Sequence, residues 1–405
     1  MGERLLVVAP HPDDETLGAG GLIARARQRG DEVFVLLMTL GDGFVEDAAR
    51  YYLSLDVNPE EYRHMGYERR METLRAMREL GVAEDRVIFL GFPDGGLDSL
   101  WRTHWDAVWT SGTTGFQKVS YLDAFNPGVP YQGRYLLDLL VSMFRDLRPN
   151  RLVMPSAFDT HPDHWATNAF ATLAWANLAQ QDLGWRAVSR WGYLVHWPAW
   201  PFPLAYQPDK PFRSPSSLIN LRQEPWRIES IGPESVEQKR RALLAHESQA
   251  ELIKPFMLTF CRATEMFSEE DRWSPLIKEG TGWFVQNPRP NWRQRLVGRE
   301  NPLASAVWKL GFQEDVVRIA MPDGFRPDYR LEVTIHTVGG SHYRWITGET
   351  LPEAVSIEPQ RQAVVMRWPR EWLGEALTVM AGVQIYVRDK CEGKVPFRVM
   401  SRSHG

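Results

Sequence analysis

Apolar runs and amphipathic stretches take turns along the first part of the chain. The apolar runs are short, nearly unbroken and rich in Val, Leu and Ile, as strands buried in a parallel sheet are. They predict strands at 4–9, 32–38, 86–90 and 151–155. The stretches between them carry apolar residues at helical spacing and predict helices at 16–28, 67–80 and 135–147. This alternation indicates an α/β fold with a Rossmann-like, doubly wound, mostly parallel sheet.

The pattern changes in the last third of the chain. A Pro-rich stretch at 287–291 is typical of a linker, and beyond it short alternating runs recur at intervals of roughly ten residues. These runs predict strands at 316–320, 331–337, 363–368, 377–387 and 396–400. We therefore expect two domains, an α/β domain over 1–285 and a smaller all-β domain, a β-sandwich, over 286–405.

Aromatic residues gather where the helical and strand patterns do not account for them. The stretch 97–132 is aromatic and has no regular period, which is typical of a functional loop, although ordinary packing explains its aromatic residues equally well. In the predicted β domain, Trp345, Trp368 and Trp372 suit an exposed glycan-binding face.

Composition narrows the class of protein. Of the 405 residues 43% are hydrophobic, so the chain can bury a large core. A net charge of −4 and the lack of long basic runs argue against a nucleic-acid partner. No apolar run reaches the roughly 20 residues of a membrane span, and no signal-peptide pattern is expected at the N-terminus. The two cysteines, Cys261 and Cys391, fit a reducing compartment, so we expect a soluble, cytoplasmic protein, with a homo-oligomer left open.

Two clusters of metal-binding residue types follow predicted strands. The sequence HPDDE at 11–15 comes directly after the first strand, and HPDH at 161–164 follows the strand at 151–155. Parallel strands end at one edge of a sheet, where such folds bind their ligands, so the two clusters are expected to meet. Two histidines and an aspartate can bind Zn2+ and leave a position open for water. The sequence therefore predicts a metal-dependent hydrolase.

The glycines at 18, 20 and 21 raise an alternative, a dinucleotide-binding loop. That motif would need a glycine at position 23, where Ile23 stands, and an acid at the end of the second strand, where Thr39 stands. The sequence argues against a dinucleotide site.

With both clusters present, the chain resembles the PIG-L/LmbE-like family of zinc-dependent N-acetylglucosaminyl deacetylases. Weaker support comes from Arg69-x-x-Glu72, from Asp94 in the loop 91–96, and from the sequence HESQ at 246–249. The resemblance covers residues 1–270, so the C-terminal strands lie outside it. It implies that the chain removes the N-acetyl group from a GlcNAc-type sugar or glycoconjugate, a small-molecule substrate.

The resemblance also implies which residues bind the metal and activate water. His11, Asp14 and His164 would bind the zinc ion. Asp13 would be the general base that takes a proton from zinc-bound water as the water attacks the acetamide carbonyl. Glu15 would support the metal loop.

The remaining motif residues would act on the substrate. His161 would stabilise the oxyanion as a cation or a hydrogen-bond donor, and Asp163 would fix its tautomer. Arg69 and Asp94 would contact the sugar, unless each of them belongs to a structural ion pair. His196 is a further candidate for the pocket.

One departure from the family leaves the extra acid open, since some members have a tyrosine before the second motif and this chain has Phe158-Asp159-Thr160.

Two alternative functions remain. The chain could be an amidase acting on a larger N-acyl amino-sugar conjugate, or a non-catalytic sugar-binding protein. The second is disfavoured because an inactive relative need not keep both Asp13 and His161 beside a full set of metal ligands.

Overall fold

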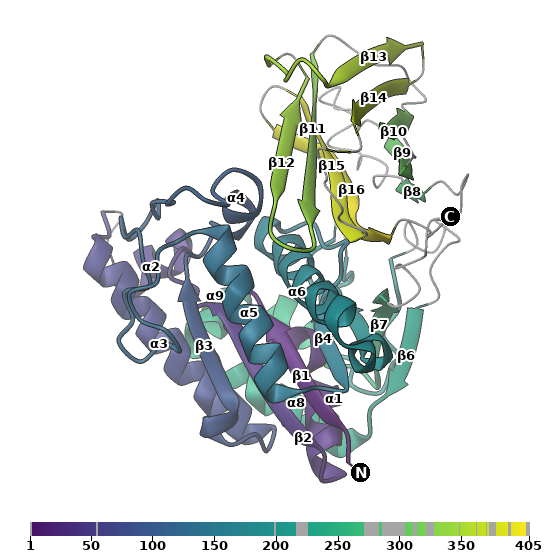
Figure 1. Ribbon diagram of the computed structural model, residues 1–405. Helices are drawn as coiled ribbons and strands as arrows, with labels where there is room; N and C mark the ends of the chain where they lie inside the picture. The colour runs from purple at the N-terminus through teal and green to yellow at the C-terminus, as the bar shows by residue number, and fades with distance from the viewer. Residues whose placement is uncertain are drawn as a thin grey trace. The chain divides into compact units, whose positions relative to one another are not determined.

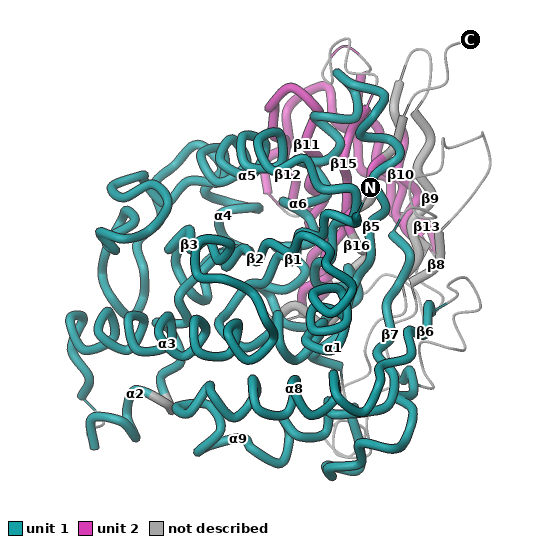
Figure 2. Tube along the Cα trace, turned by 90° about the horizontal axis from the view of Figure 1, so that it is seen from below, with its two compact units in different colours: residues 1–215, 225–271 teal, residues 216–224, 272–405 magenta. Residues whose placement is uncertain are grey.

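The computed structural model of the chain divides into two compact units, coloured separately in Figure 2. Unit 1 comprises residues 1–215 and 225–271, and unit 2 comprises 216–224 and 272–405. The predicted domain boundary after residue 285 adjoins a stretch outside the described residues, as does the predicted linker at 287–291, so both stay predictions. The structure describes residues 2–53, 56–197, 200–215, 226–270, 283–285, 304–310, 314–320, 328–347, 349–361, 363–369, 371, 378–387 and 390–401.

Unit 1 is built on one seven-stranded sheet (Figure 1). Its order is β3 (Val87–Phe92), β2 (Glu32–Thr39), β1 (Arg4–Ala9), β4 (Arg151–Pro155), β5 (Ser189–Tyr193), β7 (Thr264–Glu269) and β6 (Trp226–Ser230). The first five strands are parallel, and β7 and β6 are antiparallel to their neighbours. The α/β class with a large, mostly parallel sheet is confirmed.

Helices cover both faces of this sheet (Figures 1 and 2). One face carries α5 (Gly133–Leu147) and α6 (Pro162–Gln181), and the other carries α1 (Asp14–Gln28) and α3 (Pro59–Glu79), with α8 (Pro233–Ala245) packed on both of the latter. Shorter helices are α2 (Val45–Tyr51), α4 (Leu97–Arg102) and α9 (Glu247–Thr259), and 3-10 turns lie at Glu84–Arg86 and Leu183–Ala187. None of the described helices combines the length and the apolar character that a membrane crossing requires.

The glycines of α1 permit close packing against neighbouring side chains. A Cβ atom on Gly18 would lie 2.2 Å from the ring of Tyr193 in β5, and one on Gly21 would lie 2.2 Å from the side chain of Ile231. The ring of Tyr193 is fully buried, and its hydroxyl donates to the carbonyl of Val8 at 3.1 Å. Glycine is therefore required because the helix lies directly against neighbouring side chains.

A buried ion pair also anchors α1. Lys239 of α8 donates to Glu265 of β7 at 2.6 Å and to the carbonyl of Leu17 at 2.8 Å. Glu265 in turn accepts from the backbone N–H groups of Gly21 and Leu22, each at 2.8 Å. Both charges are satisfied inside the protein, so the pair links α1, α8 and the sheet.

The aromatic stretch 97–132 differs from its prediction. It opens with the short helix α4, and several of its aromatic side chains are buried in mutual packing, such as Trp101 against Trp105 with ring centroids 5.9 Å apart. Tyr121 and Tyr131 are also buried. Much of this segment is therefore core, as the packing alternative predicted.

Unit 2 contains two antiparallel sheets. One has the order β13 (Ser356–Gln360), β14 (Ala363–Pro369), β10 (Glu314–Ala320), β9 (Ala304–Leu310) and β8 (Trp283–Val285), and the other has the order β12 (His342–Ile346), β11 (Tyr329–Thr337), β15 (Thr378–Val387) and β16 (Lys390–Ser401).

The tryptophans expected on an exposed face of unit 2 lie in its interior instead. Trp345 and Trp368 are only 4% and 1% exposed, and their ring centroids lie 5.0 Å apart, so the expectation that they are exposed is wrong. Side chains of the two sheets meet there, and burial of their apolar rings is the physical reason. Trp372 lies outside the described residues.

Candidate metal centre

The two motif loops meet at the carboxyl ends of β1 and β4. These strands are parallel neighbours, with Leu5 paired to Arg151. The chain connects β1 to β2 on one side and β4 to β5 on the other, so the strand order reverses between β1 and β4. Loops diverge at such a point and leave a crevice for a ligand.

Asp14 stands between the two histidines predicted to bind the metal with it. Its Oδ2 atom lies 3.0 Å from Nδ1 of His11 and 3.1 Å from Nε2 of His164. All three side chains are buried. A carboxylate and an imidazole that follow β1 and an imidazole that follows β4 thus lie within the reach of one ion.

The donor set fits a metal ion for a geometric reason. Nε2 of His164 is fully buried and makes no hydrogen bond within the described part of the chain, although Asp14 Oδ2 is only 3.1 Å away. The two atoms are close but not aligned as donor and acceptor. Nδ1 of His164 is likewise buried without a hydrogen bond among the described residues, 3.2 Å from Asp159 Oδ2, so the ring lies between two carboxylates and a cation at Nε2 would complete its surroundings.

The charges around the site also fit a cation. Five carboxyl groups are buried here and a sixth, that of Asp94, is 10% exposed, against one buried arginine beside them, Arg69. A bound dication would supply positive charge that the protein lacks at this point. The six are Asp13, Asp14, Glu15, Asp94, Asp159 and Asp163.

Three groups of residues have ligand atoms within 4.8 Å of one another. They are His11 with His161 and His164, Asp14 with His164 and His196, and His11 with Asp94 and Asp163. His11 and His164 each belong to two of these groups, and the predicted set of His11, Asp14 and His164 is shared between them.

Asp163 contacts His11 through its side chain. Its Oδ2 atom lies 3.1 Å from Nε2 of His11 and accepts from the backbone N–H of Gly95 at 2.7 Å. Its Oδ1 atom accepts from the N–H of Leu97 at 3.0 Å. Both carboxylate oxygens are therefore used by His11 and by backbone groups of the loop that follows β3.

His161 is held by a backbone group. The N–H of Asp163 donates to Nδ1 of His161 at 3.2 Å, so the neutral ring carries its proton on Nε2. Burial, followed by the charge of His11 and other neighbouring histidines, lowers the pKa of His161. The backbone N–H of Asp163 therefore favours the His161 tautomer that leaves Nε2 as the donor.

Asp13 has the features of a strained functional residue. Its backbone φ is 119°, which is rare for a residue with a side chain and marks stored strain. Burial, followed by the charge of Asp14, raises the pKa of Asp13 to about 7, although Arg69 opposes the shift. A carboxyl group with a pKa near neutrality can both take up and release a proton under ordinary conditions.

The part of the chain that carries this site matches a known protein family. Residues 6–175 match the family described as PIG-L, GlcNAc-PI de-N-acetylase. The chain contains a PIG-L family domain. The match spans both motifs, so the resemblance drawn from them is confirmed.

Individual relatives agree with this family. A 1D-myo-inositol 2-acetamido-2-deoxy-alpha-D-glucopyranoside deacetylase of Kribbella flavida is 32% identical over 214 residues, which is 50% of this chain and 60% of that protein. The Mycolicibacterium smegmatis protein of the same name is 32% identical over 184 residues, covering 45% and 56%. The chain therefore spans less than two thirds of the length of these relatives.

Solved structures also align with the chain. The N,N'-diacetylchitobiose deacetylase from Pyrococcus horikoshii is 21% identical, with a TM-score of 0.41, and the alignment covers 65% of this chain and 82% of that one. A conserved protein from Thermus thermophilus is 25% identical, with a TM-score of 0.42 and coverage of 66% and 94%.

In the PIG-L domain, Arg69 is bound to the loops that carry the motifs. Its guanidinium donates to the carbonyls of Gly41 and Pro12, each at 2.8 Å, and lies 3.9 Å from Oδ2 of Asp13. Gly41 has a φ of +69°, and a Cβ there would lie 2.1 Å from the guanidinium. Arg69 therefore fixes the position of the loop around Asp13.

Asp94 faces the metal centre. Its Oδ1 atom lies 3.1 Å from Nε2 of His11, and its Oδ2 atom accepts from the N–H of Gly43 at 2.8 Å. The structure therefore brings Asp94 to the site beside a metal-ligand candidate. Each residue thus has an ionic neighbour, Asp13 for Arg69 and His11 for Asp94, so a structural ion pair stands beside sugar contact as the interpretation of both.

Asp159 is a site residue that sequence reasoning missed. Its Oδ2 atom lies 3.2 Å from Nδ1 of His164, and its Oδ1 atom accepts from the N–H of His161 at 3.0 Å. A carboxylate behind a metal-binding histidine orients the ring and raises its basicity. No spacing rule in the sequence singles out Asp159, because its role depends on its distance to His164.

Glu15 holds the loop of the first motif, residues 11–15, through a backbone hydrogen bond. It accepts from the N–H of Asp13 at 3.1 Å and lies 3.3 Å from Nε2 of His246. Glu72 of α3 accepts from the N–H and the hydroxyl of Ser248, each at 2.8 Å. The weak sequence signals at Glu72 and 246–249 thus come together in one buried network.

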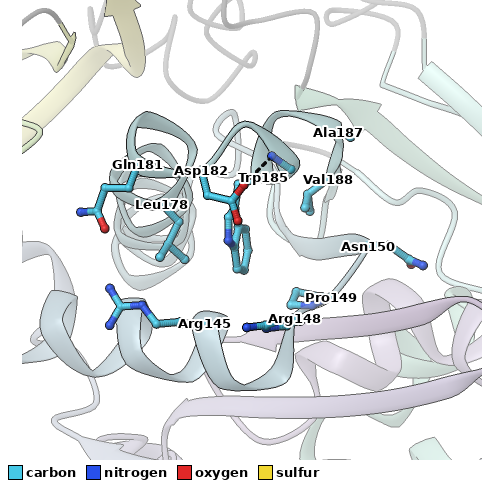
Figure 3. A pocket seen from close by; sticks show the side chains of 11 residues that line it. Arg145, Arg148, Pro149, Asn150, Leu178, Gln181, Asp182, Trp185, Ala187 and Val188 are labelled. Carbon is cyan, nitrogen blue, oxygen red and sulfur yellow. Dashed lines mark hydrogen bonds between the residues drawn. The ribbon is translucent and has the colours of Figure 1, made fainter.

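A cavity of about 440 Å³ lies elsewhere in unit 1 (Figure 3). It opens at the amino end of β4, opposite the edge that carries the motifs, and Arg145, Arg148 and Trp185 are among its lining residues. Arg145 lies in the last turn of α5 and Arg148 caps that helix, so both complement the negative end of the helix dipole. This cavity is separate from the metal centre.

Proposed function

We propose that the chain is a zinc-dependent hydrolase that removes the N-acetyl group from a GlcNAc-type sugar or glycoconjugate. One observation carries the proposal: Asp14 Oδ2 lies 3.0 Å and 3.1 Å from imidazole nitrogens of His11 and His164, with the strained carboxyl residue Asp13 beside it. The names of the Kribbella flavida and Mycolicibacterium smegmatis relatives support the substrate class.

His11, Asp14 and His164 are the proposed metal ligands. Two nitrogen donors and one carboxylate suit zinc, since zinc accepts both donor types and keeps a position open for water. Zinc in this position would lower the pKa of a bound water and polarise the acetamide carbonyl. Asp163 and Asp159 would orient His11 and His164 through their second ring nitrogens, at 3.1 and 3.2 Å.

Asp13 is the proposed general base. Its carboxylate would take the proton of the attacking water, and its pKa of about 7 matches that task at neutral pH. Arg69 lies 3.9 Å from it and would limit how far its pKa rises. The protonated Asp13 could then return the proton to the leaving amine.

His161 is the proposed oxyanion donor. With Nδ1 accepting from a backbone N–H, its Nε2–H is the group that can donate to the developing negative charge. Asp163 would act as a positioning residue through that backbone N–H. A neutral donor needs no protonation step, so the role does not depend on an imidazolium at this position.

Arg69 and Asp94 are proposed as the residues nearest the sugar. Asp94 has the stronger geometric support because its carboxylate adjoins His11 at 3.1 Å. Two guanidinium nitrogens of Arg69 are used by the carbonyls of Gly41 and Pro12. Arg69 would therefore act on the substrate mainly by holding the loop that carries Asp13.

The finer description of the fold and setting is also a proposal. The strand order of unit 1 supports a Rossmann-like, doubly wound sheet, and the contact between Trp345 and Trp368 supports a β-sandwich in unit 2. Domains over 1–285 and 286–405, a cytoplasmic location and a small-molecule amino-sugar substrate complete the proposal. A homo-oligomer remains open.

The proposal is tested by amine release. Zinc-loaded protein is incubated with N-acetylglucosamine and its glycosides, and free primary amine is measured with an amine-reactive fluorophore. We expect release by the wild type and none above background by Asp13→Asn. If the zinc-loaded wild type releases no amine from any N-acetylated amino sugar in the panel, the proposed reaction is wrong.

A further inference from the structure

His196 lies at the metal centre although it belongs to neither motif. It follows β5, the strand next to β4 in the sheet. The backbone N–H groups of Val195 and His196 donate to Oδ2 of Asp159, each at 2.9 Å. The N–H of Thr160 donates to the carbonyl of His196 at 3.0 Å. The backbone of His196 is therefore fixed to the loop that carries the second motif.

The ring of His196 is directed at the candidate ligands. Its centroid lies 4.7 Å from that of His164 and 5.2 Å from that of His161, and it stacks on Phe256 at 6.2 Å with an interplanar angle of 13°. One of its nitrogens forms a group with Asp14 and His164 in which all ligand atoms lie within 4.8 Å. Its ring nitrogens make no hydrogen bond to any residue that the structure describes.

We propose that His196 is an additional protein ligand of the metal ion, binding together with Asp14 and His164. The inference rests on the proposed function, in which Asp14 and His164 bind that ion. The ring is half-buried, and one of its nitrogens lies within 4.8 Å of the ligand atoms of Asp14 and His164. An aromatic stack and a fixed backbone leave a nitrogen free to bind a cation.

Asp159 contacts both His164 and the backbone of His196. The same Oδ2 atom that accepts from the backbone of His196 lies 3.2 Å from Nδ1 of His164. One carboxylate thus positions the ring of one ligand and the backbone of the other. The resulting donor set, with a third imidazole, is richer in nitrogen and favours zinc or cobalt over magnesium.

The test replaces the nitrogens of His196 and keeps its ring. His196→Phe can still stack on Phe256 and keeps the backbone bonds to Asp159. Metal-free protein is titrated with Zn2+ against a chromophoric chelator, and the Co2+ form is examined by visible absorption. We expect His196→Phe to bind Zn2+ at least about 10-fold more weakly, since even residues that only orient a ligand cost 10- to 100-fold, and to change the Co2+ spectrum. His104→Phe, at a histidine remote from the site, should match the wild type in both.

A second measurement needs no variant. The wild type is treated with diethylpyrocarbonate with and without Zn2+, and modified histidines are identified by mass spectrometry. A ligand should be protected by the metal, so we expect Zn2+ to suppress modification of His196. This result does not depend on how well His196→Phe folds.

The outcomes separate the inference from the proposed function. If the wild type binds Zn2+ and His196→Phe matches it in affinity and Co2+ spectrum, or if Zn2+ leaves His196 equally reactive, His196 is not a ligand while the proposed function stands. If the wild type binds neither Zn2+ nor Co2+, the proposed function fails and the inference fails with it.

Discussion

Asp13 and Asp14 are adjacent residues with opposite surroundings. Asp14 lies between two imidazoles, which lower its pKa well below the ordinary value although burial alone would raise it. Asp13 has no histidine contact of this kind and its pKa is raised to about 7. Neighbouring carboxylates with pKa values driven apart are typical of a division between a ligand and a base.

This division predicts different losses for two matched variants. Asp13→Asn keeps the side-chain volume but cannot take a proton, so we expect bound zinc to remain near one ion per chain and turnover to fall by about 100-fold or more. Asp14→Asn should instead bind zinc much more weakly. Elemental analysis and steady-state kinetics check both, and equal zinc loss in the two variants would contradict the assignment.

Asp42 gives a second test at the residue scale. It is buried, its Oδ2 atom accepts from the hydroxyl of Tyr121 at 2.6 Å, and burial followed by the charge of Asp94 raises its pKa from 3.8 to about 7. The folded state thus holds this proton more tightly than the unfolded state. The stability gained in this way is present below about pH 3.8 and is lost as the pH rises through about 7.

Asp42→Asn should therefore become more stable relative to the wild type as the pH increases. The measurement is the thermal midpoint of both proteins between about pH 5 and about pH 8. Asp85→Asn, at an exposed carboxylate, is the control and should show no such trend. A difference between Asp42→Asn and the wild type that stays constant over this range would show that Asp42 does not titrate as described.

At this scale the sequence predicted the residues of the site but not all of their partners. The motif histidines and aspartates were expected to meet because parallel strands end at one edge. The contact of Asp163 with His11 could not be foreseen, because it depends on where the first turn of α6 directs the side chain. Asp159 was missed because its role depends on its distance to His164 and on no spacing rule.

At the scale of elements, the position of α1 depends on the side chains that pack against its glycines. Alanine is intrinsically a better helix former than glycine by about 1 kcal/mol. The Cβ of Gly18→Ala would nevertheless lie 2.2 Å from the buried ring of Tyr193, and neither element can move freely. Overpacking of this kind typically costs about 1–3 kcal/mol, so the clash should outweigh the gain.

We therefore expect Gly18→Ala to lower the free energy of unfolding in urea. Gly112→Ala is the matched control, because nothing lies within 4 Å of a Cβ at Gly112. The control should leave the free energy of unfolding within about 0.5 kcal/mol of the wild type. An unchanged or increased stability of Gly18→Ala would mean that α1 can shift away from β5.

The hydrophobic pattern predicts some element boundaries and misses others. The strands β1 and β4 begin and end as predicted, because unbroken apolar runs bounded by polar residues leave little choice. Helix α3 begins at Pro59, eight residues before its predicted start, since 59–66 is mostly polar. The capping box of Asn58 and Glu61, with Pro59 in the first turn, marks this start and could have been recognised.

At the scale of the whole molecule, all candidate metal ligands and their supporting carboxylates belong to unit 1. We expect a chain ending at Asp271 to fold and to bind one zinc ion with the affinity of the full chain. The full chain, purified in parallel, is the control, and calorimetric titration with Zn2+ is the measurement. A folded shortened chain that binds no zinc would show that unit 2 contributes to the metal centre.

The anchoring of α1 has a consequence for the order of synthesis on the ribosome. His11 and Asp14 are made well before Lys239 and Glu265, yet the helix that begins at Asp14 is held by these two later residues. A nascent chain that has emerged only as far as His164 contains both metal-binding motifs but neither Lys239 nor Glu265. The metal centre should therefore mature late, after β7 has been made and inserted beside β5.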